Sequence, residues 1–280
     1  MLQNKIWNTL DFVKWNTQYF IKHKICSPKL ESELILCKLF KCKRIDLYTQ
    51  CYNTINSQQL KVIENYINRR ISGEPIQYIL ESALFYGRDF FVNKNVLIPR
   101  FDSEVIIDII KKKSPINNLL EIGTGSGNLS ITIAIENIAN NIIATDISKE
   151  ILEVARKNKK RLCPKLNINF ILDNFLTTNI NKKFDVIISN PPYIPKNEIK
   201  KLDDLVKDNE PLNALTDEKD GFTFYKQFAL QGKKILKNNG FILLEIGINN
   251  TKKKLKSIFK DYQIEFFNDL NGIPRVIQIY

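Results

Sequence analysis

The sequence is poor in histidine and in paired cysteines. His23 is the one histidine among 280 residues, and the five cysteines include no Cys-x-x-Cys pair. Catalysis by a Ser-His or Cys-His arrangement needs a histidine beside the nucleophile, and a structural zinc site needs four close ligands. These shortages argue against both, and we expect no metal.

Long apolar runs are missing as well. No stretch approaches the roughly 20 apolar residues of a membrane span, and the polar start Met1-Leu2-Gln3-Asn4-Lys5 lacks the apolar core of a signal peptide. Cysteines without a disulfide pattern agree with a reducing compartment. We therefore expect a cytoplasmic protein with no membrane partner.

The charge is strongly basic, at +12 at pH 7. A basic surface attracts phosphates, which leaves an RNA-bearing partner open. The lysines are nevertheless spread along the chain among many Ile and Asn residues, as an AT-rich coding bias would also produce. We expect that no direct contact with nucleic acid is required.

The first 73 residues have helical periodicity. Leu10, Phe12 and Val13 predict one helix, Ser27-Pro28 starts a second, and Ser57 can cap a later one. Residues 1–73 are predicted to form a small helical domain. Its apolar stripes indicate a core, with a docking face for a protein substrate as the alternative.

Residues 74–100 change character and predict a β-hairpin linker around Gly87. Asp102 or Ser103 is then expected to cap a helix through Ile109. From there to Tyr280, strand and helix patterns alternate, which predicts an α/β domain over residues 101–280 with a mainly parallel sheet covered on both faces.

One candidate site follows the apolar run Phe184–Ser189, at Asn190-Pro191-Pro192-Tyr193. A buried strand that ends in a polar residue and two prolines opens onto a loop where α/β folds bind ligands. The Asn190 side-chain oxygen and the Pro191 carbonyl offer two acceptors for an NH2 group. Tyr193 offers an aromatic face for a flat amide or base.

A second site is a glycine-rich turn between a strand and a helix, formed by Gly123, Thr124, Gly125, Ser126 and Gly127. Glycines let a ligand approach the backbone closely. The next strand ends at Asp146, whose carboxylate can accept both hydroxyls of a ribose. This order is typical of a nucleotide-binding unit.

Acidic residues decide between possible cofactors. Glu121 precedes the glycine turn, and Asp146 and Asp173 end the next two strands. A dinucleotide pyrophosphate needs positive potential, whereas S-adenosylmethionine carries a sulfonium and an ammonium and no phosphate. We therefore expect S-adenosylmethionine.

With these motifs the chain resembles the class I S-adenosylmethionine-dependent methyltransferases, and specifically the protein glutamine methyltransferases that modify peptide-chain release factors. The resemblance runs from the end of the first quarter to the C-terminus. Beyond the two sites above, it rests on Gly73–Ile79, Phe90–Val92, Val96–Arg100, Glu104, Glu210-Pro211, Ala214-Leu215, Asp220-Gly221, Leu244–Gly247, Asp269-Leu270, Gly272 and Arg275-Val276.

Some positions depart from the family's pattern. Phe101 stands where a second proline is usual, Ser103 where threonine is usual, and Glu81 where glycine is expected. The pair Asp173-Asn174 corresponds to the family's adenine site, with Asn174 in place of a frequent aromatic residue.

The resemblance implies a Rossmann-like seven-stranded sheet with an antiparallel final pair, preceded by the helical domain. It implies methyl transfer from S-adenosylmethionine to the side-chain nitrogen (N5) of the glutamine in the Gly-Gly-Gln loop of a release factor. The expected catalytic and substrate-binding residues are Asn190, Pro191, Pro192 and Tyr193. The expected cofactor-binding residues are Gly123, Thr124, Gly125, Ser126, Gly127, Asp146, Asp173, Asn174 and Asn190.

We expect a monomer whose partner is the release factor. Two alternatives stay open. The Asn-Pro-Pro-Tyr tetrad is shared with adenine-N6 methyltransferases, whose target is also an NH2 group, although no additional target-recognition region is evident. The other alternative is a non-catalytic S-adenosylmethionine-binding regulator, against which the intact Asn190 and Tyr193 argue.

Overall fold

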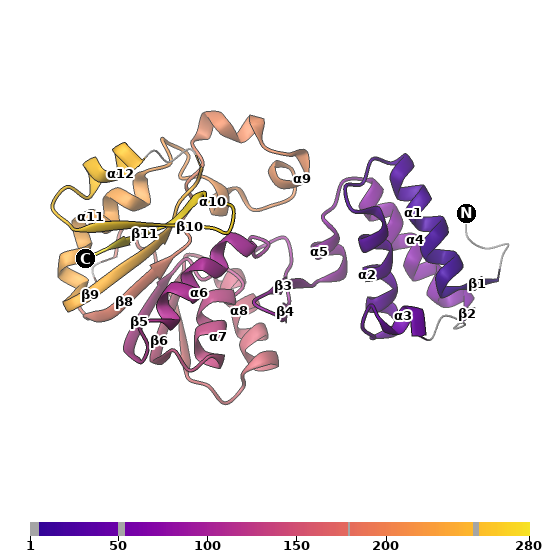
Figure 1. The fold of residues 1–280 in the computed structure, drawn as a ribbon, viewed down its shortest axis with the longest axis horizontal. Helices are drawn as coiled ribbons and strands as arrows, with labels where there is room; N and C mark the ends of the chain where they lie inside the picture. Colours follow the sequence, from indigo (N-terminus) through magenta and orange to yellow (C-terminus); the bar gives the residue numbers. More distant parts are fainter. Residues whose placement is uncertain (1–5, 50–53, 179, 249–251) are drawn as a thin grey trace. The chain divides into compact units, whose positions relative to one another are not determined.

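The structure is a computed structural model that describes residues 6–49, 54–178, 180–248 and 252–280. The chain divides into two compact units, residues 1–81 and 82–280. Figure 1 shows helices in the first unit and a sheet with helices on both faces in the second. Within the described residues, no helix has both the length and the apolar character needed to cross a membrane.

The first unit is helical, as predicted. Its helices are α1 (Thr9–Lys22), α2 (Pro28–Phe40), α3 (Asp46–Thr49), α4 (Ser57–Ile71) and α5 (Ile76–Leu80), and the strands β1 (Trp7–Asn8) and β2 (Thr54–Ile55) pair antiparallel. The cap of α4 is Asn56 rather than the predicted Ser57, because the Asn56 side chain accepts from Gln59 N and Gln59 reaches back to the Asn56 amide.

This unit has its own core. Apolar side chains of α1, α2 and α4 bury Phe12, Phe20, Ile35, Leu36 and Ile63. One buried ion pair crosses it, in which Arg70 Nε lies 2.5 Å from Glu31 Oε2. Since an isolated buried charge is costly, loss of either partner would destabilise the unit by about 3–5 kcal/mol.

The second unit is an α/β domain. Its strands are β3 (Ala83–Phe85), β4 (Arg88–Phe90), β5 (Ile116–Ile122), β6 (Ala139–Asp146), β7 (Ile168–Leu172), β8 (Phe184–Ser189), β9 (Leu236–Glu245), β10 (Ile264–Asn268) and β11 (Pro274–Ile279). Its helices are α6 (Glu104–Lys111), α7 (Asn128–Ile135), α8 (Lys149–Leu162), α9 (Asp204–Lys207), α10 (Leu212–Leu215), α11 (Thr223–Ile235) and α12 (Lys252–Ile258), with 3-10 turns η1 (Phe101–Ser103) and η2 (Lys196–Lys201).

Seven of these strands form one sheet in the order β10-β11-β9-β8-β5-β6-β7. Neighbours from β9 to β7 are parallel, whereas β11 is antiparallel to both β9 and β10. The predicted seven-stranded sheet with an antiparallel final pair is confirmed. Because β5 and β8 are adjacent and parallel, the loops that follow them meet at one edge.

The sheet is apolar on both faces. Leu119 faces a core with α6, α7 and α8, and its neighbour Leu120 faces a second core with α11 and α12. The side-chain period of two in a strand explains this alternation. Figure 1 shows the two helix layers on opposite sides of the strands.

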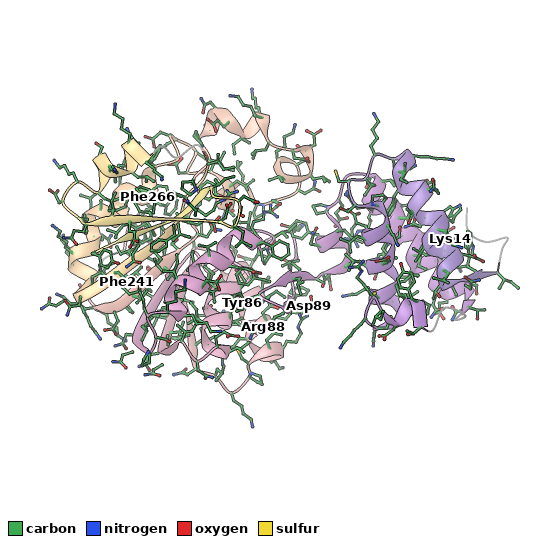
Figure 2. All side chains as sticks on the ribbon, viewed as in Figure 1. Lys14, Tyr86, Arg88, Asp89, Phe241 and Phe266 are labelled. Atoms are coloured by element: carbon green, nitrogen blue, oxygen red, sulfur yellow. The ribbon has the colours of Figure 1, made fainter. Side chains whose placement is uncertain are left out.

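The predicted hairpin around Gly87 is present as β3 and β4. Figure 2 shows Tyr86, Arg88 and Asp89 projecting from it. Arg88 pairs with Glu136 at the end of α7, Tyr86 OH donates to Asp108 Oδ1 on α6 at 3.0 Å, and Asp89 pairs with Arg161 of α8. The hairpin is thus fastened to all three helices of one layer.

Candidate active site

The glycine turn directly follows β5, as predicted. Gly123, Gly125 and Gly127 have φ values of +74°, +56° and +80°, which side chains rarely adopt. A Cβ at Gly127 would lie 2.9 Å from Ile131 Cδ1, whereas Gly123 and Gly125 have no atom within 4 Å of that position. The third glycine therefore permits close packing, and the first two leave open space beside the backbone.

Asp146, at the end of β6, holds this turn. Its Oδ2 accepts from Gly125 N at 2.9 Å and its Oδ1 from Ile147 N at 2.8 Å. Burial raises the pKa of Asp146, and the two backbone donors oppose that rise. The carboxylate is therefore fixed at the cavity with lone pairs left for further donors.

Glu121 is more deeply buried and is the second-last residue of β5. Thr124 Oγ1 donates to Glu121 Oε2 at 2.7 Å, and the carboxyl is 1% exposed. Burial raises its pKa to about 7, against the opposing effect of the Thr124 hydrogen bond. Glu121 is therefore a further acidic group of the cavity, and its carboxyl changes charge near neutral pH.

One cavity joins the glycine turn to the end of β8. Its lining includes Gly123, Thr124, Gly125, Ser126, Asp146, Asp173, Asn190, Pro191 and Pro192 from the predicted residues. Gly127, Asn174 and Tyr193 are predicted residues that do not line it. Asn174 instead accepts from Leu176 N at 3.0 Å and closes a turn.

Sequence reasoning missed the apolar wall of the cavity. Ile147 and Phe175 line it, each one residue beyond a predicted acidic or polar position. Ile147 is 53% exposed although it is a large apolar residue. An apolar residue directly after a strand-end acid could have signalled a surface for a flat ring.

Asn158 of α8 is a further residue that the sequence did not signal. Its side chain donates to Ser126 O at 2.9 Å and to Phe91 O at 2.8 Å, and accepts from Phe91 N at 2.7 Å. The side chain is fully buried. Asn158 therefore ties the glycine turn to the chain just after the hairpin.

Asn190 lies at the other end of the cavity, half-buried after β8. Its Nδ2 donates to Ser103 Oγ at 3.1 Å, and Ser103 Oγ in turn donates to Glu245 Oε2 at the end of β9. No residue in the described part of the chain hydrogen-bonds the Asn190 side-chain oxygen, which therefore remains an open acceptor.

This contact corrects the prediction that Asp102 or Ser103 caps α6. Ser103 occupies the N-cap position, but its hydroxyl makes no cap hydrogen bond because it is committed to Glu245. Asp102 pairs instead with Arg275, at 3.0 Å. Both side chains serve contacts with strands far along the chain.

Tyr193 lies beside Glu245 rather than in the cavity. Its OH donates to Glu245 Oε1 at 3.3 Å, and burial raises the pKa of the phenol. A Cβ on Gly247 would come within 2.6 Å of the ring, so the ring lies directly over that glycine. Gly247 therefore lies against one side of the ring, and Tyr193 as a whole is half-buried.

The segment before η1 also borders the cavity, through Leu97, Pro99 and Arg100. Arg100 pairs with Glu210, whose second oxygen accepts from Ile98 N at 3.2 Å. Glu210 is almost fully buried, and its two contacts hold the segment from Ile98 to Arg100 in place.

The arrangement combines a glycine-rich turn, three acids and an apolar wall with an oriented amide acceptor. The acids and the turn can hold a nucleoside that bears hydroxyls and positive charge, and the amide can receive an N–H donor. Among the described residues, no group of three or more His, Cys, Asp or Glu could hold a metal ion.

Part of each unit matches a known protein family. Residues 11–80 match the PrmC N-terminal domain and residues 100–208 the methyltransferase small domain. The release factor glutamine methyltransferase of Bacillus cereus is 34% identical over 88% of this chain and 90% of its own length. That of Bacillus subtilis is 34% identical over 95% of each chain.

Among solved structures, a methyltransferase from Pyrococcus furiosus has a TM-score of 0.50 and 18% identity, covering 80% of this chain and 98% of its own. At that identity the likeness concerns the fold alone.

Proposed function

The chain belongs to the release factor glutamine methyltransferase family, and from this membership we propose that it transfers a methyl group from S-adenosylmethionine to the N5 side-chain nitrogen of the glutamine in a release factor's Gly-Gly-Gln loop. The observation that carries the proposal is the Asn190 amide, whose oxygen is left open toward a cavity that also holds the glycine turn.

The cofactor would lie between the glycine turn and the apolar wall. Asp146 would accept the ribose hydroxyls, Ile147 and Phe175 would contact the adenine, and the acidic Glu121 favours a cationic ligand. When bound, S-adenosylmethionine supplies an electrophilic methyl carbon on a sulfonium. A cavity lined by three acids suits that charge better than a pyrophosphate.

Asn190 would orient the substrate. An amide nitrogen is a poor nucleophile, because its lone pair is delocalised into the carbonyl. If Asn190 Oδ1 accepts one N–H of the glutamine and the Pro191 carbonyl accepts the other, the lone pair turns toward the methyl carbon. No base is needed first, since attack gives a methylated amide that still carries both protons and a positive charge, and this cation is a strong acid that loses one proton to a carbonyl or to water.

Residues 1–73 would form the domain that docks the release factor, followed by the linker at 74–100. The match of residues 11–80 to the PrmC N-terminal domain supports a separate N-terminal domain and extends beyond residue 73. We propose that the enzyme acts as a monomer in the cytoplasm and requires no direct nucleic-acid contact.

The test is transfer of labelled methyl from S-adenosylmethionine by the purified protein. A release factor, its Gln-to-Ala loop variant, and duplex and single-stranded DNA are offered in parallel. Label on the wild-type factor alone is the expected result. Label on DNA would instead identify an adenine-N6 enzyme, and cofactor binding without transfer would identify a regulator.

A further inference from the structure

Three side chains from distant parts of the second unit form a chain of hydrogen bonds that includes Asn190. Ser103 comes from η1, Glu245 from the end of β9 and Asn190 from the loop after β8, with sequence separations of 87 residues for the Asn190–Ser103 bond and 142 for the Ser103–Glu245 bond. Ser103 and Glu245 are each 2% exposed. A buried contact of this kind has a defined hydrogen-bond direction.

That direction follows from donor chemistry. A carboxylate only accepts, so Ser103 must give its single O–H to Glu245. Ser103 then has only lone pairs for Asn190, and the Asn190 amide must turn its NH2 toward Ser103. The Asn190 oxygen is consequently the atom that faces away from this contact.

The opposite orientation would be unproductive. With its amide reversed, Asn190 would present an NH2 group to the NH2 group of a glutamine, and two donors cannot hydrogen-bond each other. Nothing in the Asn190 side chain itself prefers one orientation, since oxygen and nitrogen are nearly equal in size. The preference must come from its neighbours.

Building on the proposed function, we propose that Ser103 and Glu245 are positioning residues that set the orientation of the Asn190 amide, so that its oxygen faces the glutamine nitrogen. Neither residue need touch the substrate. Their effect reaches the reaction only through Asn190.

Other charged and titratable groups surround Glu245. Tyr193 OH also donates to it, and Arg275 of β11 lowers its pKa, while Asp102 of η1 raises it. Burial has the largest effect and raises the Glu245 pKa to about 7. A protonated Glu245 can donate to Ser103, which frees the Ser103 O–H to bond the Asn190 oxygen and reverses the amide.

A double-mutant cycle tests whether Ser103 acts through Asn190. Steady-state transfer to the release factor is measured for the wild type, Ser103→Ala, Asn190→Ala and the double variant. Ser103→Ala should lower kcat about 10- to 100-fold, as loss of a residue supporting an active-site ligand commonly does. On the Asn190→Ala background, the same change should have almost no further effect.

Two controls separate positioning from folding. Ser103→Thr keeps the hydroxyl and should restore kcat, and the affinity of Ser103→Ala for S-adenosylhomocysteine, measured by calorimetry, should match the wild type. The pH profile of kcat is a second readout, which a packing defect would not change. The kcat of the wild type should fall as pH drops through about 7, because Glu245 becomes protonated. Glu245→Gln should abolish this fall.

Multiplicative losses in the double variant, or a loss that Ser103→Thr does not repair, would overturn the positioning role while leaving the proposed function intact. Absence of transfer by the wild type would instead overturn the proposed function, and the positioning role with it.

Discussion

The glycine-turn end of the cavity and the Asn190 end differ in how far along the chain their supporting contacts reach. Asp146 holds Gly125 across 21 residues, within one strand-helix-strand unit. Asn190 depends on Ser103 and, through it, on Glu245, which is 142 residues from Ser103. At the cofactor end this contact therefore lies within one strand-helix-strand unit, whereas the substrate end forms only when η1, β8 and β9 have come together.

The first way to test this difference is to remove Asn190. Asn190→Ala should lower methyl transfer by about 10²- to 10³-fold, because a transition-state hydrogen bond at the reacting nitrogen is lost. Affinity for S-adenosylhomocysteine should stay near the wild-type value, since the other end of the cavity is unchanged. Transfer assays and calorimetry on one preparation separate the two effects, and undiminished transfer would refute the role of Asn190.

The converse change is Asp146→Asn. We expect about a 10-fold loss of affinity for S-adenosylhomocysteine, because a charged acceptor of two hydroxyls becomes neutral and loses one acceptor oxygen. Calorimetry measures this loss. Asp185→Asn is the matched control, because Asp185 lies at the start of β8, where it accepts from Asn118 N and pairs with Lys237. Equal losses in both variants would contradict a specific role for Asp146.

These two ends also differ in how much the sequence revealed. The glycine spacing and the acid at the end of the next strand are local patterns in the sequence. Gly123, Gly125 and Asp146, which these patterns singled out, line the cavity. The alternation of strands and helices predicted the parallel sheet, and the resemblance supplied the antiparallel final pair. Local periodicity and turn chemistry carry this information within about 30 residues.

Contacts between distant segments could not be read in this way. Ser103 was predicted to cap α6 because serine before a helix commonly does so, yet a buried carboxylate from β9 takes its hydroxyl. Tyr193 was predicted to face the substrate, and its ring lies against Gly247 and its OH bonds Glu245, outside the lining of the cavity. Asn174 was predicted to bind the cofactor, but its side chain closes a turn by accepting from Leu176 N. The next residue, Phe175, lines the cavity instead.

A smaller effect is expected from a change in the packing of Gly247 against the Tyr193 ring. Gly247→Ala should destabilise the protein by about 1–3 kcal/mol, because the added methyl would lie 2.6 Å from Tyr193 Cδ2. Thermal or urea unfolding measures the change. In a Tyr193→Ala background the same substitution should cost much less, and an equal cost in both backgrounds would show that the ring is not the obstacle.

The smallest expected effect concerns pH and stability. In the folded protein burial raises the pKa of Glu121 from 4.5 to about 7, so its contribution to stability is fully present below about pH 4.5 and is lost as pH rises through about 7. Glu121→Gln should therefore flatten the fall in the free energy of unfolding between about pH 5 and 8.

Urea unfolding across that range provides the measurement. Glu153→Gln on the exposed face of α8 is the control and should leave the slope unchanged. A wild-type slope of the opposite sign would contradict the raised pKa of the buried carboxyl.

The most direct measurement is site mapping of the transferred methyl group by tandem mass spectrometry on a release factor incubated with the enzyme and S-adenosylmethionine. We expect the added methyl on the side-chain nitrogen of the Gly-Gly-Gln glutamine, and its near absence with Asn190→Ala. A methyl group on any other residue, or equal modification by the Asn190→Ala variant, would contradict the assignment of Asn190 as the group that orients the substrate amide.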